Sequence, residues 1–129
     1  GPSTKVMPSA LNLGEVAKID GVNVTRVGRW MSSVELDAMQ STNRVVQGGG
    51  GQTYISVNGA GDFRATAPSG SLYVEFDVPV NSLVQGGKQG WFKMLGPDAS
   101  KSQKFMLGKQ GGEELPQVSN VKVVDKKAD

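Results

Sequence analysis

The stretch SLYVEFDVP, residues 71–79, alternates apolar side chains with acidic and aromatic ones. This period of two predicts a β-strand with one face in the core, and Pro79 ends the strand because proline cannot donate to a ladder. The even-numbered residues form the expected core face. The opposite face carries Tyr73, Glu75 and Asp77, which line either a surface or a cleft. Two carboxylates therefore share one face of the strongest strand in the chain.

Similar patterns on both sides of this stretch predict a strand-rich α+β domain. Ser32 and Glu35 form a capping box that begins a short amphipathic helix over 34–40, and a second helix is expected over 100–107. Residues 58–70 have the composition of a loop. Alternation and β propensity predict further strands at 22–27, 44–46, 52–57, 91–95 and 118–124.

The strand predicted at 22–27 carries an arginine on its expected inner face. Val22 and Val24 are expected to face the core, so the same period turns Arg26 inward and Val27 outward. A buried guanidinium is costly unless it has partners. We therefore expect Arg26 to lie near a strand end or a cavity that supplies them.

Composition excludes several classes of function. The 129 residues suit one domain, and the chain contains no Cys and no His. Thiolate chemistry, Ser-His-Asp and Cys-His mechanisms and His-based nucleases are therefore excluded, and a zinc site would need an all-carboxylate set, so no metal is expected. The net charge of +2 gives no argument for nucleic acid. No apolar run approaches the roughly 18–20 residues of a membrane span.

The two ends differ in composition from the middle of the chain. Residues 1–20 are polar and mixed, and we expect them to connect the domain to a larger parent protein. Residues 21–124 contain the predicted elements and form the domain. Residues 125–129 form a charged tail. The Gly1-Pro2 start is typical of a protease-cleavage scar, which suggests an excised domain.

Two groups of side chains could carry chemistry. Glu75 and Asp77, if they lie in a cleft, could stabilise a cation or act as acid and base, and otherwise they belong to the solvated face of an antiparallel sheet. Arg26 and Arg29 suit phosphate, and Trp30 suits stacking on a planar ring. The alternative for this second group is a structural salt bridge beside a core tryptophan.

Three segments together resemble a known family. They are RVGRWMS at 26–32 with Glu35, Leu36 and Met39 after it, GQTY at 51–54, and GSLYVEFDVP at 70–79 continuing to Gly96-Pro97. In this order they resemble the C-terminal toxin domains of bacterial polymorphic toxins of the Rhs and contact-dependent inhibition kind. More specifically, the chain is similar to the ADP-ribosyltransferases that modify elongation factor Tu.

The resemblance implies a mono-ADP-ribosyltransferase-like split β-sandwich with short helices around an NAD cleft. The family pattern places an Arg on the first strand, a Ser or Thr on the second and a catalytic Glu on a later one. Arg26, Thr53 (or Ser56) and Glu75 match it in order. The Ser-Thr-Ser run and the Glu-x-Glu motif of the family are absent, so the catalytic carboxylate is Glu75 or Asp77.

The resemblance also implies roles for side chains around NAD as co-substrate. Glu75 would bond the ribose and oppose the positive charge that develops on it, while Tyr54 or Trp30 would stack on the nicotinamide. Phe63 and Arg64 would contact the protein substrate. The expected NAD-binding residues are Arg26, Arg29, Trp30, Thr53, Tyr54 and Ser56.

The biological context follows from the same resemblance. The domain would be secreted from its producer by a contact-dependent or type VI system, act in the target-cell cytoplasm by modifying elongation factor Tu, and have a cognate immunity protein. Three alternatives stay open. They are a ribonuclease-type toxin that relies on Lys93 and Lys104, an NAD glycohydrolase, and a binding module without catalysis.

Overall fold

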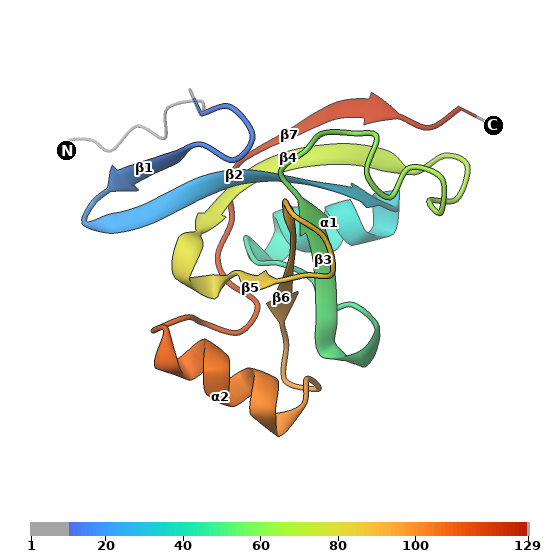
Figure 1. Cartoon of the computed structure of the whole chain (residues 1–129). Helices are drawn as coiled ribbons and strands as arrows, with labels where there is room; N and C mark the ends of the chain where they lie inside the picture. Colours follow the sequence, from blue (N-terminus) through green and yellow to red (C-terminus); the bar gives the residue numbers. More distant parts are fainter. Residues whose placement is uncertain (1–10, 129) are drawn as a thin grey trace.

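The computed structural model describes residues 11–128 and has the predicted α+β architecture (Figure 1). Two α-helices, α1 (Ser33–Thr42) and α2 (Lys101–Lys109), accompany one seven-stranded sheet in which all paired strands are antiparallel. Two short 3-10 turns are η1 (Gly49–Gly51) and η2 (Val80–Ser82). The strands are β1 (Val16–Ile19), β2 (Val22–Met31), β3 (Gln52–Ser56), β4 (Leu72–Pro79), β5 (Val84–Gln85), β6 (Trp91–Leu95) and β7 (Ser119–Lys126).

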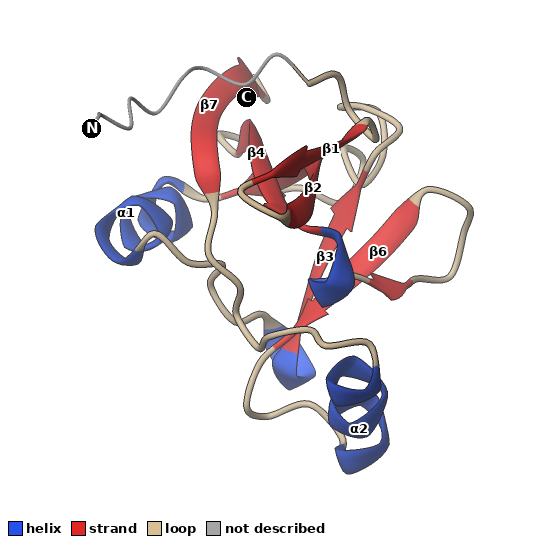
Figure 2. Cartoon of the chain, turned by 90° about the vertical axis from the view of Figure 1, so that its left-hand side faces the viewer, coloured by secondary structure: helices blue, strands red, loops and turns tan. Residues whose placement is uncertain are grey.

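The sheet divides beside its central strand, β2. Strands β2 and β4 pair continuously from Val24–Pro79 to Met31–Leu72, whereas β2 and β3 meet only at the pair Gly28–Ser56. One half-sheet therefore consists of β1, β2, β4 and β7, and the other of β3, β5 and β6. Figure 2 shows the two half-sheets extending in different directions from this junction. A gap in the ladder opens between β2 and β3 on each side of Gly28.

The hydrophobic core lies on the face of β4 that the alternation predicts. Val74, Phe76 and Val78 are buried there with Val27 and Met31 of β2. The prediction for β2 itself is wrong, because Val27 faces the core and Arg26 faces the other side beside its partner Asp77. The error arises because Val22 lies at an exposed strand end, so its position says nothing about the core.

Helix α1 has the N-cap that the sequence indicates, but it begins one residue before and ends two residues after the predicted range 34–40. The Ser32 hydroxyl accepts a hydrogen bond from the Glu35 backbone N–H at 3.0 Å, as an N-cap should. Asn43 closes the helix in the left-handed conformation (φ 56°), a position that asparagine tolerates. The Glu35 side chain does not return to the cap, since it pairs with Arg29 instead. The helix start therefore supplies a carboxylate to the end of β2.

Several boundaries differ from the prediction, among them the end of β2, which continues four residues beyond the predicted 22–27 to Met31. Residues 16–19, expected in a connector, form β1 and pair with 22–25, while residues 1–10 lie outside the described part. The expected strand 44–46 is reduced to one bridge between Arg44 and Gln117. Strand β7 continues to Lys126, two residues into the expected tail. The division of the chain into connector, domain and tail itself stays a prediction.

Candidate functional site

A pocket of about 590 Å³ lies at the end of β2, beside the gap between the half-sheets. Its size is within the range of about 300–1,000 Å³ that is usual for small-molecule and cofactor sites. The walls come from both half-sheets, the start of α1 and the loop between β3 and β4. They are formed by Arg29, Trp30, Met31, Ser32, Ser33, Glu35, Tyr54, Phe63 and residues 66–71.

The Arg29 guanidinium bridges the gap between β2 and β3, because it binds Glu35 of α1 and also the backbone of β3. Its Nε and Nη2 donate to the two carboxylate oxygens of Glu35, with 3.0 Å between Nη2 and Oε1. Its Nη1 donates to the Tyr54 carbonyl of β3 at 2.8 Å. A two-point ion pair of this kind orients the plane of the guanidinium. The partly exposed guanidinium of Arg29 therefore has a fixed orientation on the pocket wall.

Three aromatic side chains, those of Trp30, Tyr54 and Phe63, line the same pocket. The Phe63 ring lies 4.3 Å from the Trp91 ring and 6.4 Å from the Tyr54 ring, measured between centroids. Trp30 donates its indole N–H to the Ala60 carbonyl at 2.7 Å, and the Arg64 guanidinium lies 5.3 Å from its ring centroid. The structure thus brings together four of the residues expected around NAD or substrate. They are Arg29, Trp30, Tyr54 and Phe63.

Arg26, Glu75 and Asp77 also come together, but they bond to one another. Arg26 Nη1 lies 2.9 Å from Asp77 Oδ1 and 3.0 Å from the Asn120 carbonyl, and its Nε lies 3.3 Å from Glu75 Oε1. Arg26 and Asp77 are buried, whereas the Glu75 side chain is 21% exposed. The partners expected for Arg26 are therefore present. None of these three residues lines the pocket.

The two hydroxyl candidates on β3 lie on opposite faces. Thr53 is buried on the core side, where its hydroxyl donates to the Val46 carbonyl at 2.6 Å and accepts from the Gly48 N–H at 2.9 Å. Ser56 lies on the other face and donates to Asp62 Oδ2 at 2.6 Å. The Thr53 side chain therefore stabilises the segment that precedes β3. Ser56, at the pair that joins the half-sheets, binds the loop between β3 and β4.

Sequence reasoning missed Asp62. Its Oδ2 accepts three hydrogen bonds, from Ser56, from Asn58 Nδ2 at 2.9 Å and from Trp91 Nε1 at 2.7 Å. The bond from Ser56, then those from Asn58 and Trp91 and the charge of Lys88, outweigh desolvation and hold the pKa of Asp62 below its usual value. A single acid in a loop has no periodicity, so no sequence signal pointed to it.

Tyr73 supplies a second unexpected feature of the same face. It is buried, and no residue in 11–128 provides a hydrogen-bond partner for its hydroxyl. Burial, with smaller contributions from the Glu75 and Asp62 carboxylates, raises the pKa of Tyr73 to about 12. The hydroxyl lies directly over Gly28, where any Cβ would overlap it. Glycine is therefore required at the residue that joins the half-sheets.

Comparison with known proteins adds one finding to this geometry. The sequence model of the family described as "TreTu toxin, C-terminal domain" matches residues 24–124. The chain belongs to this family. The recognition of a C-terminal toxin domain is thereby confirmed. The match runs from within β2 to within β7 and includes the pocket, while β1 lies before it. No curated protein matches the chain.

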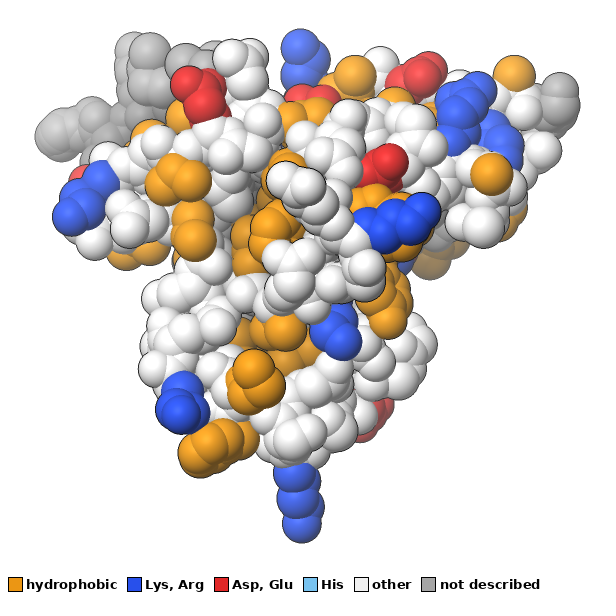
Figure 3. All heavy atoms as spheres, in the orientation of Figure 1, with side chains coloured by type: hydrophobic (Ala, Val, Ile, Leu, Met, Phe, Trp, Pro, Cys, Tyr) orange, Lys and Arg blue, Asp and Glu red, His pale blue; other side chains and the backbone are white. Residues whose placement is uncertain are grey.

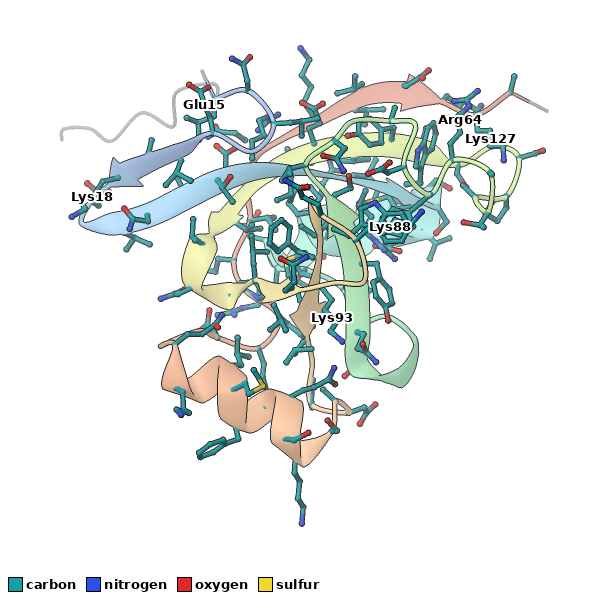
Figure 4. All side chains as sticks on the ribbon, in the orientation of Figure 1. Glu15, Lys18, Arg64, Lys88, Lys93 and Lys127 are labelled. Atoms are coloured by element: carbon teal, nitrogen blue, oxygen red, sulfur yellow. The ribbon has the colours of Figure 1, made fainter. Side chains whose placement is uncertain are left out.

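The surface of the toxin domain near the junction carries several basic side chains. Figure 4 shows Arg64 and Lys127 side by side at the end of β7, with Lys88 and Lys93 lower on the same view, and Figure 3 shows hydrophobic side chains between basic ones on this face. Lys127 Nζ donates to the Arg64 carbonyl at 2.7 Å. Among residues 11–128, acidic side chains form no cluster of three or more suited to a metal ion.

Neither α1 nor α2 is long and apolar enough to cross a bilayer, and they are the α-helices of the described range. On α2 the large exposed apolar side chains are Phe105 and Met106, and the same short helix also contains three lysines.

Proposed function

We propose that this toxin domain is a mono-ADP-ribosyltransferase that transfers ADP-ribose from NAD to elongation factor Tu and so blocks translation. The observation that carries the proposal is the pocket at the sheet junction, in which Arg29 is oriented by Glu35 among aromatic rings. NAD consists of two nucleosides, each a planar base on a ribose, joined through a diphosphate. A fixed guanidinium suits the diphosphate, and aromatic faces suit the bases. The single-pair junction between the half-sheets supports a split β-sandwich.

In this proposal Arg29, rather than Arg26, binds the diphosphate or the adjacent ribose. The reason is that Arg29 lines the pocket, whereas Arg26 is buried and already matched by two carboxylates. Tyr54 and Trp30 keep their proposed roles as stacking partners. Ser56 acts through Asp62, and Thr53 supports the pocket only through the chain before β3.

The carboxylate of the reaction has two candidates. Cleavage of the nicotinamide–ribose bond builds positive charge on the sugar, and a fixed carboxylate lowers the energy of that state. Glu75 is the catalytic residue that the sequence favours, and of the two carboxylates that pair with Arg26 it is more exposed than Asp77. Glu35 is the acid on the pocket wall itself. Asp77, buried and bonded to Arg26 and Asn120, is reassigned to supporting Glu75.

The loop beside the pocket supplies the proposed contact with the protein substrate. Arg64 is exposed there and retains this role. Phe63 is turned inward against Trp91 and lines the pocket, so its proposed role changes from protein contact to pocket wall. Family membership supports the remaining context, which is delivery by a contact-dependent or type VI system, action in the target-cell cytoplasm and neutralisation by a cognate immunity protein.

The test incubates the domain with labelled NAD and purified elongation factor Tu, followed by mass spectrometry of the factor. We expect Arg29→Ala to reduce labelling at low NAD concentration about a hundredfold, because hydrogen bonds to a charged group such as the diphosphate contribute up to about 3 kcal/mol. Arg44→Ala is the matched control, because Arg44 also pairs with a glutamate but lies outside the pocket. Glu75→Gln and Glu35→Gln, measured alongside, identify the carboxylate by the larger loss of kcat.

Each alternative gives a different result in the same assay. Consumption of NAD without labelled protein indicates an NAD glycohydrolase. Degradation of RNA by a sample that leaves NAD intact indicates a ribonuclease-type toxin. If the wild type does neither and NAD is untouched, the proposed function is wrong.

A further inference from the structure

The first residues of the loop between β3 and β4, 58–62, form hydrogen bonds that hold this loop against the junction of the two half-sheets. Asn58 donates to the Gln89 carbonyl at 3.1 Å, and the Ala60 carbonyl accepts from the Trp30 indole at 2.7 Å. Asp62 makes the most bonds of this segment, since one of its oxygens accepts from β3, from the loop and from β6. The carboxylate therefore ties three parts of the chain to one point.

The next residue, Phe63, has a backbone conformation that is unfavourable for a bulky side chain. Its φ of 65° is in the left-handed region, which residues other than glycine, asparagine and aspartate rarely adopt. Such conformations persist when the surroundings over-determine them. Here the surroundings are the Asp62 anchor before Phe63 and the Trp91 ring against which Phe63 packs.

Asp62 and Phe63 act on the same tryptophan. The Asp62 carboxylate accepts the indole N–H of Trp91 at 2.7 Å, and the Phe63 ring lies against that indole at 4.3 Å. The carboxylate thus sets the orientation of the surface on which the Phe63 ring rests. The other side of Phe63 lines the pocket together with Tyr54 and Arg29.

We propose that Asp62 is a positioning residue that acts through Trp91 and Phe63 to form one wall of the nucleotide pocket. The identity of the ligand rests on the proposed function, whereas the placement of the Phe63 ring does not. Asparagine at position 62 keeps one oxygen at this point but is neutral, so all three hydrogen bonds lose the contribution of the carboxylate charge. The substitution should loosen the indole and the ring that rests on it.

The experiment uses the full chain labelled with 5-fluorotryptophan and observed by fluorine NMR, with the two signals assigned from Trp30→Phe and Trp91→Phe. We expect Asp62→Asn to shift and broaden the Trp91 signal. Asp37→Asn is the matched control, because Asp37 is an exposed acid on α1 and the charge change is the same. It should leave both signals in place.

Kinetics with NAD then separate positioning from chemistry. We expect Asp62→Asn to raise KM for NAD about tenfold, the effect of losing a charge-assisted hydrogen bond, with kcat within about twofold. Phe63→Leu, which keeps the carboxylate but removes the ring, should raise KM similarly. The double variant should add little beyond either one, because both act through the same wall.

The outcomes decide the proposal even if the proposed function fails. A Trp91 signal that does not respond to Asp62→Asn overturns it. A fall in kcat with KM unchanged also overturns it, since the carboxylate would then act on the reaction itself. If the wild type ignores NAD, the proposed function is wrong, and the Trp91 signal of Asp62→Asn and Phe63→Leu still decides the positioning role. Should Asp62→Asn fail to fold, Trp91→Phe removes the indole N–H that Asp62 accepts while keeping an aromatic ring, and it should raise KM for NAD to the same extent; an unchanged KM overturns the proposal.

Discussion

Arg26 and Asp77 form a buried ion pair across strands β2 and β4, with 2.9 Å between Nη1 and Oδ1. Asn120 of β7 donates to the second oxygen of the same carboxylate, also at 2.9 Å. Three strands of one half-sheet are therefore joined through one acid. Because both side chains are buried, the loss of Asp77 leaves the Arg26 guanidinium with only the partly exposed Glu75 to balance its charge.

Asp77→Ala should consequently destabilise the domain by about 3 kcal/mol, the lower end of the usual cost of removing one member of a buried pair, because Glu75 still pairs with Arg26. Urea unfolding followed by circular dichroism measures the change. The control is Asp125→Ala, since Asp125 is exposed and its ion pair with Arg64 is long at 3.8 Å. That variant should stay within about 0.5 kcal/mol of the wild type. A stable Asp77→Ala protein without transferase activity would instead assign Asp77 to catalysis.

Tyr73→Phe should leave stability unchanged or raise it by up to about 1 kcal/mol, because the buried hydroxyl has no hydrogen-bond partner among residues 11–128. Thermal and urea unfolding of the two proteins provide the comparison. The ring and its packing on Trp30, at 5.3 Å between centroids, are retained in the variant. A loss of stability above about 1 kcal/mol would show that the hydroxyl is bonded in solution.

Gly28→Ala should destabilise the domain by at least about 1–3 kcal/mol, the range for overpacking a tight site. The added methyl group would overlap the Tyr73 hydroxyl at the pair that joins the half-sheets. Gly61→Ala is the control, because a Cβ at Gly61 meets no atom within 4 Å. Equal stability of the two variants in urea would contradict the close packing at the junction.

Asp62 should make the stability of the domain depend on pH in acid. Its pKa is lower in the folded protein than the ordinary value of 3.8, so its contribution is complete above that value and is lost as the pH falls through the folded-state pKa. The neighbouring Tyr73, whose pKa is raised to about 12, keeps its proton throughout this range. The measurement is the free energy of unfolding between about pH 5 and pH 2, where Asp62→Asn should show a shallower decline than the wild type.

The parts of the fold that could be predicted are those determined by neighbouring residues. The alternation in 71–79 identifies the core face of β4, and the Ser32–Glu35 capping box identifies the start of α1. Both signals are local, because strand period and helix capping involve residues within a few positions of one another. For the same reason the α+β class follows from the sequence.

The site depends on relations that local patterns do not contain. Arg26 and Arg29 lie three residues apart on one strand and therefore face opposite sides, and only the orientation of β2 decides which one reaches the pocket. That orientation follows from pairing with β4, some fifty residues later. Asp62 has partners from β3 and β6, which its own neighbours in the sequence do not reveal.

The central place of β2 also has a consequence for how the chain reaches its native state. Strand β2 is complete at Met31, yet its long ladder is with residues 72–79, and β4 then requires residues 119–126 on its other side. Each pairing must close a long loop before it gains any stabilising contact. Domains dominated by such distant pairings fold in about milliseconds to seconds rather than microseconds. Until β4 arrives, the nascent chain has a ten-residue strand with an unpaired edge, so aggregation during synthesis is the hazard that this topology creates.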